Sequence, residues 1–160
     1  MNENNIFIKG WSYMDKKIRK AVRTYLIKDN RIVVINYKKH DTGYYDIPGG
    51  KVEENETPEE TSIREFKEET GINIEKQHYI GKIIIEFPDI IFDFNVFIVD
   101  EYNGEPLESD ENKSMWINLN DLNGETKVFP SIIAIKYLKD NMNLKINCES
   151  NDKIIEILEQ

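Results

Sequence analysis

The alternation of apolar and polar residues divides the chain into short segments that predict strands before and after one long helix. The expected strands cover residues 21–28, 31–38, 79–87, 90–102 and 115–118. Asp29-Asn30 reads as a hairpin turn between the first two, and a short helical piece is expected around Asp121. Helical spacing of apolar residues predicts a second helix at 131–142, and the tail 144–160 is ambiguous, a strand followed by a short terminal element. This order favours a mixed sheet between helices.

The long helix has clear start and stop signals. Thr57 is a capping residue, Pro58 occupies the first helical position, and a glutamate follows three residues after the cap. Gly71 provides the stop, because glycine adopts positive φ without strain. Ile63 and Phe66 are expected to pack on a core.

The same helix carries five glutamates, three of which are predicted to share one face. Glu65, Glu68 and Glu69 are spaced i, i+3 and i+4. Their carboxylates repel one another, and a hard divalent cation such as magnesium, which prefers oxygen ligands, would remove that repulsion. The alternative is a solvated acidic helix with ion pairs to Arg64 and Lys67.

Composition favours a small enzyme. The chain has 160 residues, 39% of them hydrophobic, and we expect one domain with a core at about 18–142 and a C-terminal extension at 143–160. The net charge of −9 argues against binding a nucleic-acid backbone or an anionic membrane. The single cysteine, Cys148, excludes an internal disulfide. No apolar stretch has transmembrane length and no signal peptide is recognisable, so a cytoplasmic location is expected.

The run from residue 50 to residue 72, GKVEENETPEETSIREFKEETGI, resembles the Nudix box. That motif is Gly, five residues, Glu, seven residues, then Arg-Glu-aliphatic-any-Glu-Glu-any-Gly-aliphatic. The matching positions are Gly50, Glu56, Arg64, Glu65, Glu68, Glu69, Gly71 and Ile72. Phe66 departs from the aliphatic position but keeps its apolar role. The resemblance implies the Nudix fold, an α/β/α sandwich with a central mixed β-sheet.

The resemblance also implies a metal-dependent hydrolase with a small-molecule nucleotide substrate. Such enzymes hydrolyse a nucleoside diphosphate linked to another group, through attack of water on phosphorus. By box position, Glu65 and Glu69 would bind Mg²⁺ (Mn²⁺ is possible) or activate water, and Glu68 would complete the metal shell. The backbone carbonyl of Gly49 would be a further ligand. Which glutamate acts as general base stays open.

The remaining box residues have expected structural roles. Arg64 is among the catalytic candidates and is expected to orient Glu56 through a bidentate ion pair rather than touch substrate. Gly50 and Gly71 would shape the turns at the two ends of the segment, and Pro48-Gly49-Gly50 is a tight turn where backbone approaches a ligand.

A second resemblance covers residues 104–116, GEPLESDENKSMW, which are similar to the matching segment of MutT-type oxidised purine nucleotide diphosphatases. In those enzymes an acid of this loop is a metal ligand or base, which points to Glu111, or to Asp110 one place earlier. The alternative is a plain acidic loop. The MutT-like interpretation further places Lys38 against a phosphate or base edge, and Asp46 near the nucleobase, where its carboxylate could accept from a purine N–H.

The base-reading groups of both MutT subgroups are absent. Eukaryotic-type members carry a Trp and paired acids where this chain has residues 124–130, and bacterial members place an asparagine soon after a Phe-Pro pair, where Phe129-Pro130 is followed by Ser131. Some ADP-ribose pyrophosphatases carry a proline where Pro88 stands, but a turn between two strands is the favoured explanation, because it needs no substrate.

The expected function is therefore a Mg²⁺-dependent pyrophosphohydrolase. It would cleave nucleoside triphosphates, of the 8-oxo-dGTP type or other (d)NTPs, to nucleoside monophosphate and pyrophosphate. The alternatives are hydrolysis of ADP-ribose or another nucleoside diphosphate derivative, and a non-catalytic nucleotide-binding module. The complete set of box acids favours an enzyme.

Overall fold

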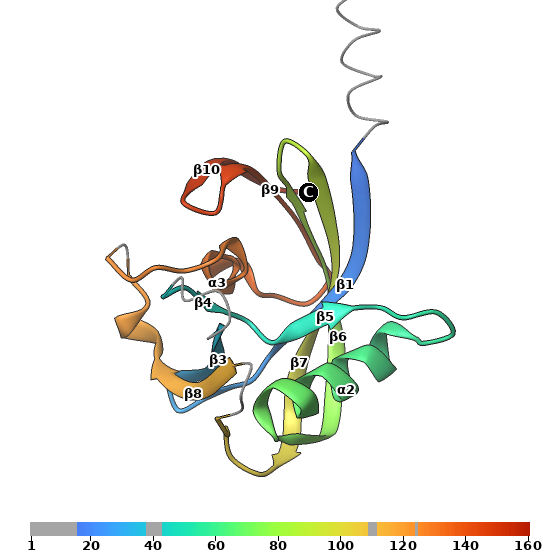
Figure 1. The fold of residues 1–160 in the computed structure, drawn as a ribbon, viewed down its shortest axis with the longest axis vertical. Helices are drawn as coiled ribbons and strands as arrows, with labels where there is room; N and C mark the ends of the chain where they lie inside the picture. The colour runs from blue at the N-terminus through green and yellow to red at the C-terminus, as the bar shows by residue number, and fades with distance from the viewer. Residues whose placement is uncertain (1–15, 38–42, 109–111, 124) are drawn as a thin grey trace, which may run out of the picture.

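The computed structural model describes residues 16–37, 43–108, 112–123 and 125–160. The chain forms two β-sheets with helices on opposite sides (Figure 1). The strands are β1 (Lys17–Tyr25), β2 (Ile27–Lys28), β3 (Arg31–Tyr37), β4 (Tyr45–Asp46), β5 (Gly49–Lys51), β6 (Asn73–Glu86), β7 (Ile90–Asn103), β8 (Asn112–Asn118), β9 (Met142–Ser150) and β10 (Lys153–Glu159). The helices are α2 (Pro58–Thr70) and α3 (Pro130–Ile133), with 3-10 turns η2 (Leu119–Asp121) and η3 (Ala134–Tyr137).

The larger sheet is mixed, as the sequence predicts, with strand order β10-β9-β6-β7-β1-β5. The pairs β1–β7 and β6–β9 are parallel, and the other neighbours in this sheet are antiparallel. The smaller sheet contains β2, β3 and β4, with β8 on the other side of β3. In the part of the chain that the structure describes, no helix is long and apolar enough to span a bilayer.

Successive side chains of β1 contact helices on opposite faces of the larger sheet. The Thr24 hydroxyl lies 2.7 Å from the Ser62 hydroxyl of α2, and the Tyr25 hydroxyl donates to the Ser131 carbonyl of α3 at 2.7 Å. Because neighbouring residues of a strand point to opposite faces, β1 lies between the two helices. Figure 1 shows α2 and α3 on either side of β1 and β5. The expected α/β/α layering is confirmed.

Local sequence signals are reproduced closely. Asp29 and Asn30 adopt φ angles of 52° and 60° in the β2–β3 hairpin, as a tight two-residue turn requires. The Thr57 hydroxyl accepts the Glu60 backbone N–H at the start of α2, and Gly71 ends the helix with φ of 79°. These features depend on neighbours in the chain, which explains why they are predictable.

The expectation that both Ile63 and Phe66 pack on a core is wrong for Ile63. Phe66 is fully buried, whereas Ile63 is 43% exposed. The helix is turned so that its inner face includes Ser62, Phe66 and the acid Glu69, which places Ile63 at the outer edge. The rotation of α2 that brings Glu69 to the Gly49 N–H therefore leaves Ile63 exposed.

The predicted helix at 131–142 is too long. Helical structure ends at Tyr137, and Met142 already belongs to β9 and pairs with Gly81 of β6. Asn141, at φ of 60°, reverses the chain immediately before the strand. The tail forms two antiparallel strands, β9 and β10, and β6 begins at Asn73, earlier than expected.

We predict that Phe66→Ala lowers the free energy of unfolding by about 3 kcal/mol or more, because it leaves a cavity in the core. The matched variant Ile63→Ala, on the exposed edge of the same helix, should lower it by about 1 kcal/mol or less. Urea denaturation followed by circular dichroism measures both. Equal losses for the two variants would contradict this orientation of α2.

Candidate active site

The glycine turn at β5 packs directly on the acidic face of α2. The Gly49 backbone N–H donates to the Glu69 carboxylate at 2.8 Å. A Cβ placed on Gly50 would lie 2.4 Å from the carboxyl carbon of Glu65, and one on Gly49 would lie 1.9 Å from the Val22 carbonyl oxygen. Gly49 requires glycine, because a Cβ there would clash with the backbone of β1, whereas a Cβ at Gly50 would displace the Glu65 carboxyl.

Burial makes two acids of this face, Glu69 and Glu65, weaker than usual. It raises the pKa of Glu69 to about 8, although the Gly49 N–H and the positive charge of Arg23 act in the opposite direction. Burial also raises the pKa of Glu65, against the hydrogen bond and charge of Arg64. A divalent cation would remove the cost of ionising these carboxyls, so the site is suited to exchange protons for a metal ion.

Arg64 and Glu56 form the bidentate ion pair that the sequence analysis anticipates. Arg64 donates from Nε and Nη2 to the two Glu56 carboxylate oxygens at 2.7 and 2.9 Å, and Thr61 donates to one of them at 2.6 Å. The hydrogen bonds from Arg64 and then Thr61 lower the pKa of Glu56 to about 2. Arg64 Nη1 also donates to Glu65 at 3.0 Å and to Glu68 at 3.3 Å. One guanidinium therefore connects the loop before α2 to two box acids.

The donor set of this face fits a hard cation such as Mg²⁺ or Mn²⁺. The carboxylates of Glu65, Glu68 and Glu69 come from positions i, i+3 and i+4 of one helix, and the Gly49 N–H is hydrogen-bonded to Glu69. Glu68 is largely exposed, with 58% of its side-chain surface accessible. Within the described ranges no three Asp, Glu, His or Cys side chains already surround a common point. Glu111, the expected ligand outside the box, lies outside the described residues, as does Asp110.

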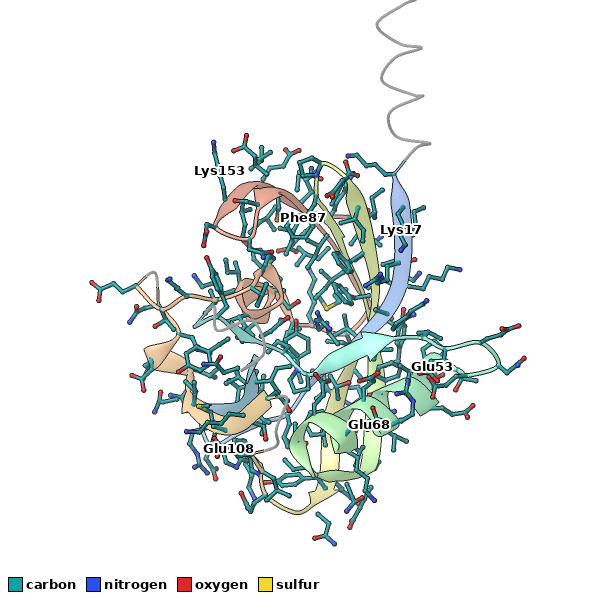
Figure 2. All side chains as sticks on the ribbon, viewed as in Figure 1. Lys17, Glu53, Glu68, Phe87, Glu108 and Lys153 are labelled. Atoms are coloured by element: carbon teal, nitrogen blue, oxygen red, sulfur yellow. The ribbon has the colours of Figure 1, made fainter. Side chains whose placement is uncertain are left out.

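A cavity of about 450 Å³ opens on the α3 side of the sheet, and its lining includes Arg23 and Asp46, whose charges act on Glu69. This volume is typical of sites for small molecules. Figure 2 shows Phe87 near the top of the view and Glu68 on α2 well below it. The cavity has aromatic walls and a polar end, formed by Phe87, Phe92, Phe94, Phe129, Arg23, Asp46 and Ser131.

The polar end is held together by Arg23. Its guanidinium donates from Nη2 to Asp46 at 3.3 Å and from Nε to the Ser131 hydroxyl at 3.1 Å, and it lies 4.2 Å from the centroid of Phe94. Asp46 is 4% exposed and accepts the Ile47 backbone N–H at 2.7 Å. Burial raises the pKa of Asp46, and the charge of Arg23 opposes this.

Sequence reasoning identified Asp46 but missed Arg23. The available signal was a single arginine inside the largely apolar run from Ala21 to Leu26. Lys38, the other expected substrate contact, lies outside the described residues. Pro88 occupies the β6–β7 turn, in which the Phe87 N–H donates to the Ile90 carbonyl at 2.8 Å. That hairpin accounts for the proline without a substrate.

We predict that Glu69→Gln changes how stability depends on pH in the metal-free protein. Between about pH 5 and pH 8, the folded chain holds a proton on Glu69 that the unfolded chain has lost. As the pH rises through this range, the free energy of unfolding should therefore fall by about 1.4 kcal/mol per pH unit because of Glu69. The glutamine variant should not show this decrease. Urea denaturation in a chelator at pH 5, 6.5 and 8 measures the difference.

The control for this prediction is Glu68→Gln, a change at a largely exposed acid of the same helix. The stability profile of this variant should run parallel to that of the parent protein. Parallel profiles for the parent and Glu69→Gln would show that Glu69 is already ionised at pH 5.

Comparison with known proteins identifies relatives of this chain. The NUDIX domain pattern matches residues 17–135. The chain is 34% identical over 95 residues to an 8-oxo-dGTP diphosphatase of Proteus vulgaris, covering 58% of this chain and 85% of that protein. It is 31% identical over 112 residues to the 8-oxo-dGTP diphosphatase of Escherichia coli K12, covering 69% and 87%.

Similar solved structures include a MutT protein from Bacillus halodurans, with a TM-score of 0.73 at 18% identity, covering 89% of this chain and 97% of that one. A MutT NUDIX hydrolase from Burkholderia pseudomallei aligns with a TM-score of 0.67 at 25% identity, covering 78% and 100%. The first of these likenesses concerns the fold alone. Since the matched pattern spans most of the chain and includes the glycine turn and α2, the chain belongs to the NUDIX domain family as a MutT-like member.

Proposed function

We propose that the chain is a metal-dependent pyrophosphohydrolase that cleaves a nucleoside triphosphate to nucleoside monophosphate and pyrophosphate. The observation that carries this proposal is that the Glu69 carboxyl, which accepts from the Gly49 N–H, interacts electrostatically with Arg23 and Asp46 at the polar end of the aromatic cavity. The relatives named as 8-oxo-dGTP diphosphatases support the same substrate class. The substrate partner is thus a small nucleotide, bound with its base in the cavity and its phosphates toward α2.

Glu65, Glu68, Glu69 and the Gly49 carbonyl would hold Mg²⁺ or Mn²⁺, with Glu111 joining from its loop. When bound, the metal supplies charge neutralisation on the phosphates and a more acidic water. Arg64 is a positioning residue: through its hydrogen bonds it fixes Glu56 and limits the rotation of Glu65. Glu69, which accepts from the Gly49 N–H, and Glu65 are both candidates to take the proton of the attacking water.

The cavity end would orient the nucleoside. Asp46, held by Arg23 and the Ile47 N–H, accepts an N–H of the base, and the phenylalanine walls exclude water from its faces. Lys38 is proposed to meet a phosphate. We also propose that residues 1–160 form one domain, in which the extension 143–160 contributes Ser150 and Asn151 to the cavity wall.

We predict that the purified protein with Mg²⁺ converts at least one nucleoside triphosphate to monophosphate and pyrophosphate. The panel contains 8-oxo-dGTP, the four dNTPs, ADP-ribose and a dinucleoside polyphosphate, and ion-exchange chromatography separates the products. Glu69→Gln should lower turnover about 100-fold or more, because it removes a negative ligand or base. The matched control Glu59→Gln, at an acid in the first turn of the same helix, should leave turnover unchanged.

Two outcomes would refute the proposal. Release of AMP from ADP-ribose, without attack on any triphosphate, would assign the chain to the nucleoside diphosphate-derivative hydrolases. A folded protein that turns over none of these compounds with Mg²⁺ or Mn²⁺ would instead indicate a nucleotide-binding module.

A further inference from the structure

Glu69 occupies the last turn of α2, which is the part of a helix that is held least firmly. The helix ends at Thr70, and the carbonyl groups of a final turn have no partner within the helix. Helix ends fray for this reason. A metal ligand, in contrast, has to stay within about 0.5 Å of its productive position. The main chain of Glu69 therefore requires a contact from outside α2.

Asn112, the first residue of β8, provides such a contact. Its side-chain amide donates from Nδ2 to the Glu69 carbonyl oxygen at 3.0 Å, and the residue is 4% exposed. Asn112 also pairs with Tyr37 of β3, so the smaller sheet sets its position. The contact ties the main chain of a box acid to a sheet that contains no residue of the box.

Two further contacts act on neighbouring groups at this end of the helix. The Leu107 backbone N–H donates to the Thr70 carbonyl at 2.9 Å. The Gly49 N–H donates to the Glu69 carboxylate at 2.8 Å. The carboxylate and the main chain of Glu69 are thus held from different elements, β5 and β8, and the direction of the side chain depends on both.

The chemistry at this position suits asparagine. A carbonyl oxygen only accepts, so its partner must donate, and an amide donates without carrying charge. A carboxylate of the same shape would face both the carbonyl and the negative end of the helix dipole. A lysine or arginine would also donate, but its positive charge would oppose the binding of a cation nearby. A neutral donor therefore anchors Glu69 and leaves the negative charge of the acids available to a metal ion.

We propose that Asn112 is a positioning residue for metal binding, which holds the main chain of Glu69 so that its carboxylate meets the cation together with Glu65. The inference rests on the proposed function, because that function makes Glu69 a metal ligand. Asn112 itself touches neither metal nor substrate in this role. Groups that orient a ligand in this way typically change metal affinity by about 10- to 100-fold when they are removed.

Binding of Mn²⁺ to the nucleotide-free protein tests the proposal without requiring turnover. Electron paramagnetic resonance of unbound Mn²⁺ compares the parent with Asn112→Leu, which keeps the branched shape but lacks the donor, and with Asn112→Ser, which is too short to reach the carbonyl. Both variants should weaken Mn²⁺ binding about tenfold. If Asn112→Leu does not fold, Asn112→Ser decides the test. An unchanged dissociation constant in a folded variant would overturn the proposal.

The matched control is Ser114→Ala, two residues further along β8. Ser114 is 5% exposed, and its hydroxyl donates to the Leu107 carbonyl at 2.7 Å, so it bonds the loop before β8 rather than α2. Each of the three substitutions removes one buried side-chain bond to a carbonyl, and thermal unfolding should show similar losses of stability. The Mn²⁺ affinity of Ser114→Ala should nevertheless stay within about twofold of the parent. Equal weakening of Mn²⁺ binding by Ser114→Ala would make Asn112 a structural residue and overturn the proposal.

Turnover gives a second measurement. The Mg²⁺ concentration for half-maximal turnover should rise about tenfold in Asn112→Ser, and added Mg²⁺ should recover part of the lost rate. A loss of rate by the same factor at every Mg²⁺ concentration would instead indicate less folded protein and would overturn the proposal. Asn112-dependent Mn²⁺ binding by a parent without hydrolase activity would refute the proposed function alone. Hydrolysis by a parent whose Mn²⁺ affinity is indifferent to Asn112 would refute this inference alone, and a parent that binds no Mn²⁺ would overturn both.

Discussion

The contact between the Gly49 N–H and the Glu69 carboxylate is the constraint on which the rest of the site depends. It fixes the rotation of α2 about its axis, and with it the direction of Glu65, which lies against Gly50. The same rotation leaves Ile63 in solvent and puts Ser62 against Thr24 of β1. Burial then raises the pKa of both acids, a cost that a bound cation would offset.

The features that were predictable from sequence are those set by near neighbours. The cap at Thr57, the stop at Gly71 and the Asp29-Asn30 turn each depend on a few consecutive residues, and all three are found. The Arg64–Glu56 ion pair belongs to the same group, because the two residues are eight positions apart in one motif. Local geometry brings such groups together whatever the remainder of the chain does.

The features that were not predictable depend on contacts between distant segments. The helix expected at 131–142 ends early because Met142 is drawn into a parallel pairing with β6, some sixty positions earlier in the chain. The cavity combines residues from β1, the β6–β7 hairpin, α3 and the end of β9. The pattern of apolar and polar residues along the sequence does not indicate that these distant segments meet. Arg23 was missed because its partners Asp46 and Ser131 come from two other elements of the chain.

The family pattern covers the acids of the site but only part of the cavity wall. The acids and the glycine turn lie inside the matched NUDIX region 17–135, whereas Ser150 and Asn151 at the cavity wall lie beyond it. Ser131 follows Phe129-Pro130, where bacterial MutT-type members place an asparagine nearby, and its hydroxyl accepts from Arg23. Ser150 and Asn151 are therefore the part of the cavity wall that the family pattern does not cover, whereas Arg23, Asp46 and Ser131 lie inside it.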